Sequence, residues 1–401
     1  MAQQLRCPVE LSASQRLVRD NVQELCSEFD DEYWRQNDLH GEYPTEFVDL
    51  LSEHGWLGIL VPEEYGGAGM STPEVVVMME EIAACGGGFA TAQAIHGGVY
   101  NSVPIVKYAD ERMKEKLLPA VADGETSIQA FGLTEPNAGS DSTSIETTAE
   151  RDGDRYVVNG NKIWTSRVDQ SDYIVLMART TPKAEVEKRT KGISMFLVDI
   201  DDAMEQGALD LQQIPKSVSE FVHSYELWFE DFRIPAENLI GEEDEGFYQV
   251  LDGLNEERLV IAAECIGLGE AALGRGVSYA NEREVFDRPI GKNQAIQHPL
   301  AESYMHLQAA KQLTYDAASR LDGEVLESAG TLANTSKYLA ANACYQAADA
   351  AVQTHGGFGV AREYDVERYF REARLTRLVP ITQQLALNYV AENELRLPRS
   401  Y

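Results

Sequence analysis

The sequence predicts a mainly α-helical protein with an all-β domain in the middle of the chain. Apolar residues recur at three- and four-residue spacing from Ser12 to about Ala122, which indicates amphipathic helices. From about Ser127 to Gly241 the pattern changes to short β-branched or aromatic runs separated by Gly, Asn and Asp. The helical period returns at Glu245 and continues to the end of the 401 residues, a length that suits two or three packed domains.

The N-terminal region is expected to hold several helices interrupted by a glycine-rich turn. The stretches LSASQRLVRDNVQELCSEF and TEFVDLLSEHG have helical spacing, and VPEEYGGAGM indicates the turn. The next helix, STPEVVVMMEEIAA, is expected to begin with Ser71 or Thr72 as its N-cap and Pro73 at its first helical position.

The middle and C-terminal regions differ in their residue types. RYVVNGNKIWTS, DYIVLMART and GISMFLVDI are typical of strands, and Asn159–Gly160 predicts a two-residue hairpin turn. Alanine-rich stretches after Glu245 allow helices to pack closely, as in a bundle. We therefore expect domains at residues 1–126, 127–243 and 244–401.

The chain is strongly acidic. It carries 66 Asp and Glu against 11 Lys and 23 Arg, a formal net charge of −32, and the acids are spread over every segment. This balance excludes the basic footprint of a nucleic-acid-binding protein. An acidic, lysine-poor surface predicts a protein adapted to molar salt. At that concentration the Debye length falls to about 3 Å, so the acidic side chains no longer repel one another over longer distances. A merely acidic protein from a low-salt cell is the alternative.

Cysteine spacing and hydropathy exclude other classes. The five cysteines are far apart with no CxxC pair, so neither a disulfide framework nor a structural metal site is expected. The N-terminus lacks an apolar signal core and no run of about 18 apolar residues occurs. We expect a cytoplasmic protein that does not bind membranes.

Three stretches carry residues suited to binding a cofactor. FGLTEPNAGSD (131–141) offers the hydroxyls of Thr134 and Ser140 and exposed N–H groups around Gly139, which suit a heteroaromatic ring or a phosphate, although a plain turn would look the same. NGNKIWTSR (159–167) places a stacking face two residues from a hydroxyl, although a tryptophan is often a core residue. QTHGGFGV (353–360) has glycines that would let backbone approach a phosphate, but not the GxGxxG spacing of a dinucleotide fold.

Taken together, these and other stretches resemble the acyl-CoA dehydrogenase family. The matching stretches, in the family's order and spacing, are LVPEEYGGAGM, FGLTEPNAGSD, NGNKIWTSR, GISMFLV, WFEDFRIPAENLIGEEDEGF, NEREVFDRPIGKNQAIQHPLAE and QTHGGFGV. They span essentially the whole chain. The resemblance implies a helical N-terminal domain, a β-barrel middle domain and a C-terminal four-helix bundle, with FAD between them, in a homotetramer.

The resemblance also implies which positions contact the ligands. The positions implied for the flavin are Phe131, Leu133, Thr134, Gly139, Ser140, Trp164 and Ser166, the last with its hydroxyl at flavin N5. The ADP part of a neighbouring subunit's FAD is implied to contact Arg283, Phe286, Gln294, Gln353 and Gly357, and two further FAD contacts are Thr382 and Gln384. The positions implied for the acyl-CoA are Ser140, Asn255 and Arg258. From the residues alone, Arg283 could equally form a surface ion pair and Phe286 belong to a core.

The family reaction needs a base that removes a proton beside the thioester while a hydride leaves the β-carbon for flavin N5. Many members place a glutamate near the C-terminus, where this chain has Pro380 in RLVPITQQLAL. Isovaleryl- and long-chain-type members place it on a helix of the bundle, in a context that GLNEERL matches at Glu257. Helical geometry agrees, because Glu257 shares a stripe with apolar residues whereas Glu256 is expected on a wetter stripe facing solvent. The alternative for Glu257 is a buried ion-pair partner of Arg258 or of another arginine.

Pro380 also removes a backbone N–H that the family uses to hold the thioester carbonyl. A second donor, a local shift of the chain or a different chemistry would each be consistent with this residue. The expected activity is dehydrogenation of an acyl-CoA with electrons passed to an electron-transfer flavoprotein. The alternatives are an oxidase or monooxygenase-like enzyme on the same scaffold, or a non-catalytic protein that binds FAD or acyl-CoA.

Salt adaptation has a direct test. We expect the protein to unfold as KCl is diluted from molar to millimolar concentration, because the acidic side chains then repel one another over a longer distance. Circular dichroism of the folded protein against KCl concentration measures this, and full stability in dilute buffer would contradict the prediction.

Overall fold

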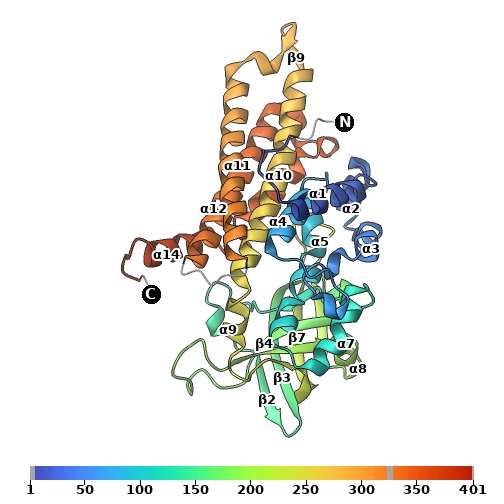
Figure 1. Cartoon of the computed structure of the whole chain (residues 1–401), viewed down its shortest axis with the longest axis vertical. Helices are drawn as coiled ribbons and strands as arrows, with labels where there is room; N and C mark the ends of the chain where they lie inside the picture. Colours follow the sequence, from blue (N-terminus) through green and yellow to red (C-terminus); the bar gives the residue numbers. More distant parts are fainter. Residues whose placement is uncertain (1–4, 323–327, 400–401) are drawn as a thin grey trace.

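The computed structural model describes residues 5–322 and 328–399, and it consists of three regions along the chain (Figure 1). The N-terminal helices are α1 (Ala13–Cys26), α2 (Asp31–His40), α3 (Thr45–Glu53), α4 (Thr72–Ala83), α5 (Phe89–Tyr100), α6 (Val103–Tyr108) and α7 (Glu111–Ala122). Helix α4 has Ser71 as its N-cap residue, one of the two predicted positions, but Pro73 is the second residue of the helix and not the first, and the Ser71 side chain makes no capping hydrogen bond. No helix in the described part of the chain is both long and apolar enough to span a bilayer.

The middle region is one mixed sheet with a short helix, α8 (Ile200–Glu205), between two of its strands. The strands are β1 (Ala130–Gly132), β2 (Thr148–Asp152), β3 (Arg155–Ser166), β4 (Tyr173–Arg179), β5 (Ile193–Asp199), β6 (Leu209–Gln213), β7 (Ser224–Pro235) and β8 (Leu239–Ile240). Their order is β6-β7-β3-β2-β4-β5-β8, and β1 adds to β4 in parallel.

The expected β-barrel is wrong, because the sheet is open. Strands β6 and β8 lie at its two ends and do not pair with each other within residues 5–322 and 328–399. Only two residues of β8 pair with β5, so this edge offers too few backbone groups to close a barrel.

The predicted hairpin turn at Asn159–Gly160 is also wrong. Both residues lie inside β3, and the turn that joins β2 to β3 is at Gly153 and Asp154. The register between β3 and β7 shifts at Gly160, which marks a β-bulge. A Cβ at Gly160 would lie 2.6 Å from Thr147 Cα, so the glycine serves close strand packing and not a turn.

The C-terminal region is a helical bundle with a small hairpin at one end. Its helices are α9 (Gly246–Leu251), α10 (Leu254–Glu282), α11 (Gln294–Leu321), α12 (Ala329–His355), α13 (Val366–Thr376) and α14 (Gln383–Asn393), and the hairpin is β9 (Glu284–Val285) with β10 (Arg288–Pro289). In Figure 1 the hairpin lies at the top of the bundle and the sheet lies beyond its other end. The helices pack as closely as the alanine content predicts, since a Cβ at Gly269 of α10 would lie 3.2 Å from Cys344 Cα of α12.

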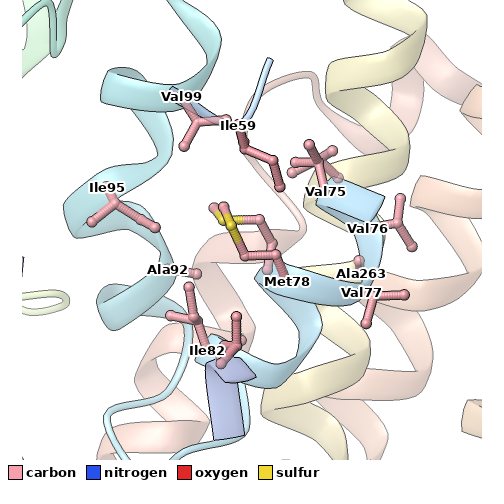
Figure 2. Packing of buried hydrophobic residues seen from close by; sticks show 14 of the residues in the cluster. Ile59, Val75, Val76, Val77, Met78, Ile82, Ala92, Ile95, Val99 and Ala263 are labelled. Atoms are coloured by element: carbon pink, nitrogen blue, oxygen red, sulfur yellow. The ribbon is translucent and has the colours of Figure 1, made fainter. Parts of the chain in front are cut away.

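A buried apolar cluster joins the N-terminal helices to α10. Figure 2 shows Met78 of α4 facing Ile95 and Val99 of α5, with Ala263 of α10 behind α4. At the crossing of α10 with α4, a Cβ on Gly267 would lie 2.2 Å from the carbonyl oxygen of Glu80. The absence of a side chain there lets the two helices touch through their backbones.

A buried ion pair holds the loop after β1 against the sheet. Lys162 Nζ donates to Glu135 Oε1 at 2.7 Å and to the carbonyl oxygen of Leu133 at 3.1 Å. The Glu135 carboxylate also accepts the backbone N–H groups of Glu146 and Thr147 at 2.6 and 2.9 Å. Burial lowers the pKa of Lys162 to about 8, while the neighbouring Glu135 carboxylate opposes that shift. The pair therefore fixes the segment that carries Leu133 and Thr134.

We predict that Lys162→Met destabilises the protein by about 3–5 kcal/mol, because it leaves the Glu135 carboxylate buried without its cation. The double variant Lys162→Met with Glu135→Gln should recover part of this loss, because no uncompensated charge remains. Denaturant unfolding at constant KCl measures both. Equal stability of wild type and Lys162→Met would contradict the role of the pair.

Candidate active site

A cavity of about 120 Å³ lies where α5, α6, the start of α10 and the sheet meet. Its wall is mainly apolar, with Val103, Phe131 and Leu254 among its residues. The charged or ionisable side chains that line it are His96, Tyr100, Lys107, Tyr108, Arg167 and Glu257. An apolar hollow with a few converging polar groups is the usual form of a small-molecule site.

Glu257 stands in the first turn of α10 with its side chain 23% exposed. The apolar stripe expected beside it is present, because Ile261, Cys265 and Leu268 are buried. Its nearest ionic contact is with His96, whose Nε2 lies 3.5 Å from Glu257 Oε1. Arg258 instead donates to Asn255 Oδ1 at 3.0 Å, so the geometry does not favour the alternative of a Glu257–Arg258 pair.

His96 lies between two carboxylates of α10. Its Nδ1 is 2.7 Å from Glu264 Oε1, on the side opposite its contact with Glu257, and its ring stacks on Tyr100 with 5.4 Å between ring centroids. Glu264 is completely buried and accepts a second hydrogen bond from Gln93 Nε2 at 2.7 Å. Burial alone would lower the pKa of His96, but Glu264 and Glu257 outweigh it and raise that pKa to about 9. The imidazole is therefore positively charged at neutral pH.

The expected wetter stripe behind Glu256 is not what the structure shows. Glu264, which follows Glu256 on the same helical stripe, is completely buried. Glu256 itself is only half-buried, and its Oε2 is buried without a hydrogen-bond partner. The helical period did not predict this burial, because Glu264 is covered by contacts with Gln93 and His96 of α5.

Of the residues assigned to the flavin, Phe131 is the one among those that line the cavity, and the others lie on β3 or on the loop after β1. Phe131 lines it directly, and Leu133 and Thr134 follow on the loop that Lys162 holds. Trp164 has a positive φ of 63° and is 54% exposed, so it is not a core residue. The Ser166 hydroxyl lies 2.9 Å from that of Ser224.

These features fit a flavin ring. Exposed aromatic faces beside a hydroxyl suit a planar heteroaromatic group. Gly139 and Ser140 are exposed, and a Cβ at Gly139 would meet no atom within 4 Å, so a ligand can approach the backbone there.

A second group of assigned residues lies at the other end of α10. A hollow of about 470 Å³ is lined by Tyr279, Arg283, His355, Gly357 and Phe358. The Arg283 guanidinium lies 5.9 Å from the Phe358 ring centroid, and the nearby Phe286 is 92% exposed with a φ of 53°. Neither of the earlier alternatives fits these two residues, since Phe286 is not core and Arg283 faces an aromatic ring. Gln294 and Gln353 are exposed near this end, on α11 and α12.

The structure does not bring the two groups together within one chain. An α-helix rises about 1.5 Å per residue, so the 26 positions from Glu257 to Arg283 correspond to roughly 39 Å.

The remaining assigned residues lie around the C-terminal segment and the start of α10. Thr382 caps α14 by accepting the N–H of Leu385 at 3.4 Å, and Gln384, the second residue of that helix, is exposed. Pro380 is exposed in the loop before α14 and is not among the residues that line the cavity.

Sequence reasoning missed four residues of the site. His96, Tyr100 and Glu264 were not singled out, and NGNKIWTSR drew attention to its tryptophan and serine but not to Arg167. The Arg167 guanidinium is buried and donates to the carbonyl oxygens of Gln93 at 2.6 Å and Gln129 at 3.4 Å. A histidine within the otherwise small and apolar run QAIHGG was the available signal for the first of them.

Comparison with known proteins is consistent with this arrangement. Residues 12–125, 130–232 and 244–395 match the N-terminal, middle and C-terminal domains of acyl-CoA dehydrogenases. The chain is 34% identical over 391 residues to acyl-CoA dehydrogenase FadE12 of Mycobacterium tuberculosis, covering 97% of this chain and 98% of that protein. It is 33% identical over 378 residues to the caffeyl-CoA reductase–Etf complex subunit CarC of Acetobacterium woodii, covering 92% and 94%.

Solved structures agree over the same length. The glutaryl-CoA dehydrogenase in complex with glutaryl-CoA superimposes with a TM-score of 0.88 at 30% identity, covering 98% of each chain. With all three domains matched in order and relatives aligned over nearly their full length, the chain belongs to the acyl-CoA dehydrogenase family and is an oxidoreductase that acts on CH–CH bonds.

Proposed function

We propose that the protein converts an acyl-CoA thioester to a trans-2-enoyl-CoA, with Glu257 as the base that takes the α-proton. The observation that carries this proposal is the Glu257 carboxylate at the wall of an otherwise mainly apolar cavity, on the side facing α5. An acyl chain suits the apolar wall, and the α-carbon must come within about 3–3.5 Å of the carboxylate for proton transfer.

The cofactor we propose is FAD, which supplies an acceptor for the β-hydride when bound. Phe131, Leu133, Thr134, Trp164 and Ser166 would hold its ring system, with Gly139 and Ser140 on the same loop. This chain's own contribution to the reaction is to orient the thioester between that ring and Glu257, and to exclude water with the apolar wall. Ser140, Asn255 and Arg258 would contact the acyl-CoA.

The distance between the two groups of cofactor residues supports an assembly of several chains. Arg283, Phe286, Gln294, Gln353 and Gly357 lie at the far end of α10 and would hold the ADP part of a neighbouring subunit's FAD, with Thr382 and Gln384 as further contacts. We therefore propose a homotetramer. The electron acceptor we propose is an electron-transfer flavoprotein, as the name of the related CarC subunit suggests by analogy.

An oxidase on the same scaffold is the second candidate. The crystal structure of the prolyl acyl carrier protein oxidase AnaB is similar, with a TM-score of 0.86 at 25% identity. The two candidates share the first half-reaction and differ in how the reduced cofactor is reoxidised.

An anaerobic titration tests the proposed reaction. The protein is purified in molar KCl, its visible flavin band is recorded, and a panel of acyl-CoA thioesters is added without oxygen. We expect the band to bleach with the substrates, and then to return with electron-transfer flavoprotein but slowly with O₂. Rapid return with O₂ would favour the oxidase, and no bleaching with any thioester would contradict catalysis.

We predict that Glu257→Gln lowers the rate of flavin reduction by about 10²–10⁴-fold with the flavin band intact, because the amide cannot accept the proton. Glu256→Gln is the matched control, since it neutralises the adjacent carboxylate on the same helical turn and should leave the rate nearly unchanged. Stopped-flow absorbance measures both. Reduction of Glu257→Gln at the wild-type rate would exclude Glu257 as the base.

A further inference from the structure

The described residues contain one row of ionisable groups that reaches from the cavity into the core. It runs from Glu257 at the cavity wall, through His96 of α5, to Glu264 two helical turns further along α10. The row is buried towards its inner end, since Glu257 is 23% exposed while Glu264 is fully buried. Nothing in the family reaction as described above requires a second carboxylate or an imidazole there.

We propose that His96 is a positioning residue for Glu257: clamped by Glu264, its imidazole fixes the direction of the Glu257 carboxylate and places a positive charge beside it. This inference rests on the proposed role of Glu257 as the base.

The geometry of the clamp is specific. Glu264 receives Gln93 Nε2 and His96 Nδ1, each at 2.7 Å, on its two different oxygens, so its carboxylate cannot turn without losing a hydrogen bond. With Nδ1 committed to Glu264, only Nε2 remains to face the cavity, and it lies 3.5 Å from Glu257 Oε1. The stacked Tyr100 ring limits rotation of the imidazole from one side. His96 is therefore held by two contacts that do not involve Glu257, and Gln93 fixes the carboxylate that makes one of them.

The charges around His96 favour an imidazolium. The carboxylates that face it are Glu257 and Glu264 of α10. Burial raises the pKa of Tyr100 well above its usual value, so the phenol stays neutral, and the Glu256 carboxylate adds to that shift. Arg167, at the end of β3, is the remaining buried cation near the row, and its interaction with Glu264 and Glu257 opposes the lowering of its own pKa by burial. His96 is thus the cation in direct contact with both carboxylates, whereas Arg167 donates to backbone carbonyl oxygens.

This arrangement has a functional consequence. A base must be unprotonated when the substrate arrives, and a buried carboxylate tends to take up a proton from solvent. The adjacent imidazolium attracts negative charge on that carboxylate and so opposes the uptake of a proton. Glu264 also contacts the imidazolium, from the side opposite Glu257.

The test is the pH dependence of flavin reduction in the holoenzyme. With His96→Gln, we expect the acid limb of the pH–rate profile to move to higher pH by about one unit or more, so that the rate falls about tenfold on the acid side and recovers at high pH. His96→Lys restores a cation beside Glu257 and should move the limb back towards the wild-type position. A merely structural role would lower the rate equally at every pH.

The controls separate this inference from the proposed function. His54→Gln makes the same change on an exposed histidine of the N-terminal region and should leave the profile unchanged. If Glu257→Gln is inactive but the limb of His96→Gln coincides with that of wild type, the inference about His96 is wrong and the base stands. If His96→Lys behaves as His96→Gln does, the charge is not the cause and the inference is wrong as well. Wild-type reduction by Glu257→Gln would instead overturn the proposed function itself.

The variants are checked for retained flavin before any rate is compared. If His96→Gln does not retain it, His96→Asn replaces it, because a smaller amide removes the same charge with less steric demand. For His96→Asn we expect the same move of the acid limb to higher pH as for His96→Gln. An acid limb that coincides with that of wild type would contradict the inference about His96.

Discussion

The position of the whole site depends on the close crossing of α10 with α4. Gly267 lets the two helices touch through backbone atoms, where a Cβ would lie 2.2 Å from the Glu80 carbonyl oxygen. The segment that leads from α4 to α5 is then held in place, because Arg368 donates to the carbonyl oxygens of Gly86 and Gly87 at 2.8 and 2.7 Å. With α4 and this segment fixed, α5 lies against α10 at the level where His96 meets Glu257 and Glu264. A larger residue at 267 would therefore disturb the site without touching it.

Buried and surface charges follow different rules in this protein. In the core, Lys311 Nζ donates to Glu80 at 2.6 Å and to Glu270 at 3.1 Å, and Arg6 donates to Glu270 at 3.0 Å. Such pairs are removed from solvent, so salt screens them little. The chain as a whole has a formal net charge of −32, because its acids outnumber its bases. Salt concentration should thus change the repulsion among exposed carboxylates far more than the internal pairs. The carboxylates of the site belong to the internal class, which separates catalysis from salt dependence of the fold.

The order of helical and β regions could be predicted from the sequence because hydrophobic period is a local property. The inward direction of Glu257 was predicted from the same period. The start of α4 after Ser71 was predicted from a local capping pattern. Contacts between distant segments could not be predicted in this way. His96 and Glu257 are far apart in the chain, and nothing near either residue records their contact. The bulge at Gly160 depends on the approach of Thr147 from a neighbouring strand, and closure of the sheet depends on whether β6 and β8 meet. The helical period therefore predicted the direction of Glu257, but packing decided that His96 and Glu264 lie beside it.

The length of α10 connects the chemistry to the assembly. A helix of 29 residues is nearly rigid, so it holds Glu257 and the segment with Arg283 and Phe286 at a constant separation that one cofactor molecule cannot bridge along it. Phe286 is 92% exposed, which is an unfavourable state for a large apolar side chain unless another surface covers it. A neighbouring chain that presents the ADP part of its cofactor to this end would cover that ring and neutralise part of the Arg283 charge. In the homotetramer proposed here, cofactor binding and subunit association would then stabilise each other, because each subunit completes a site whose catalytic carboxylate belongs to another.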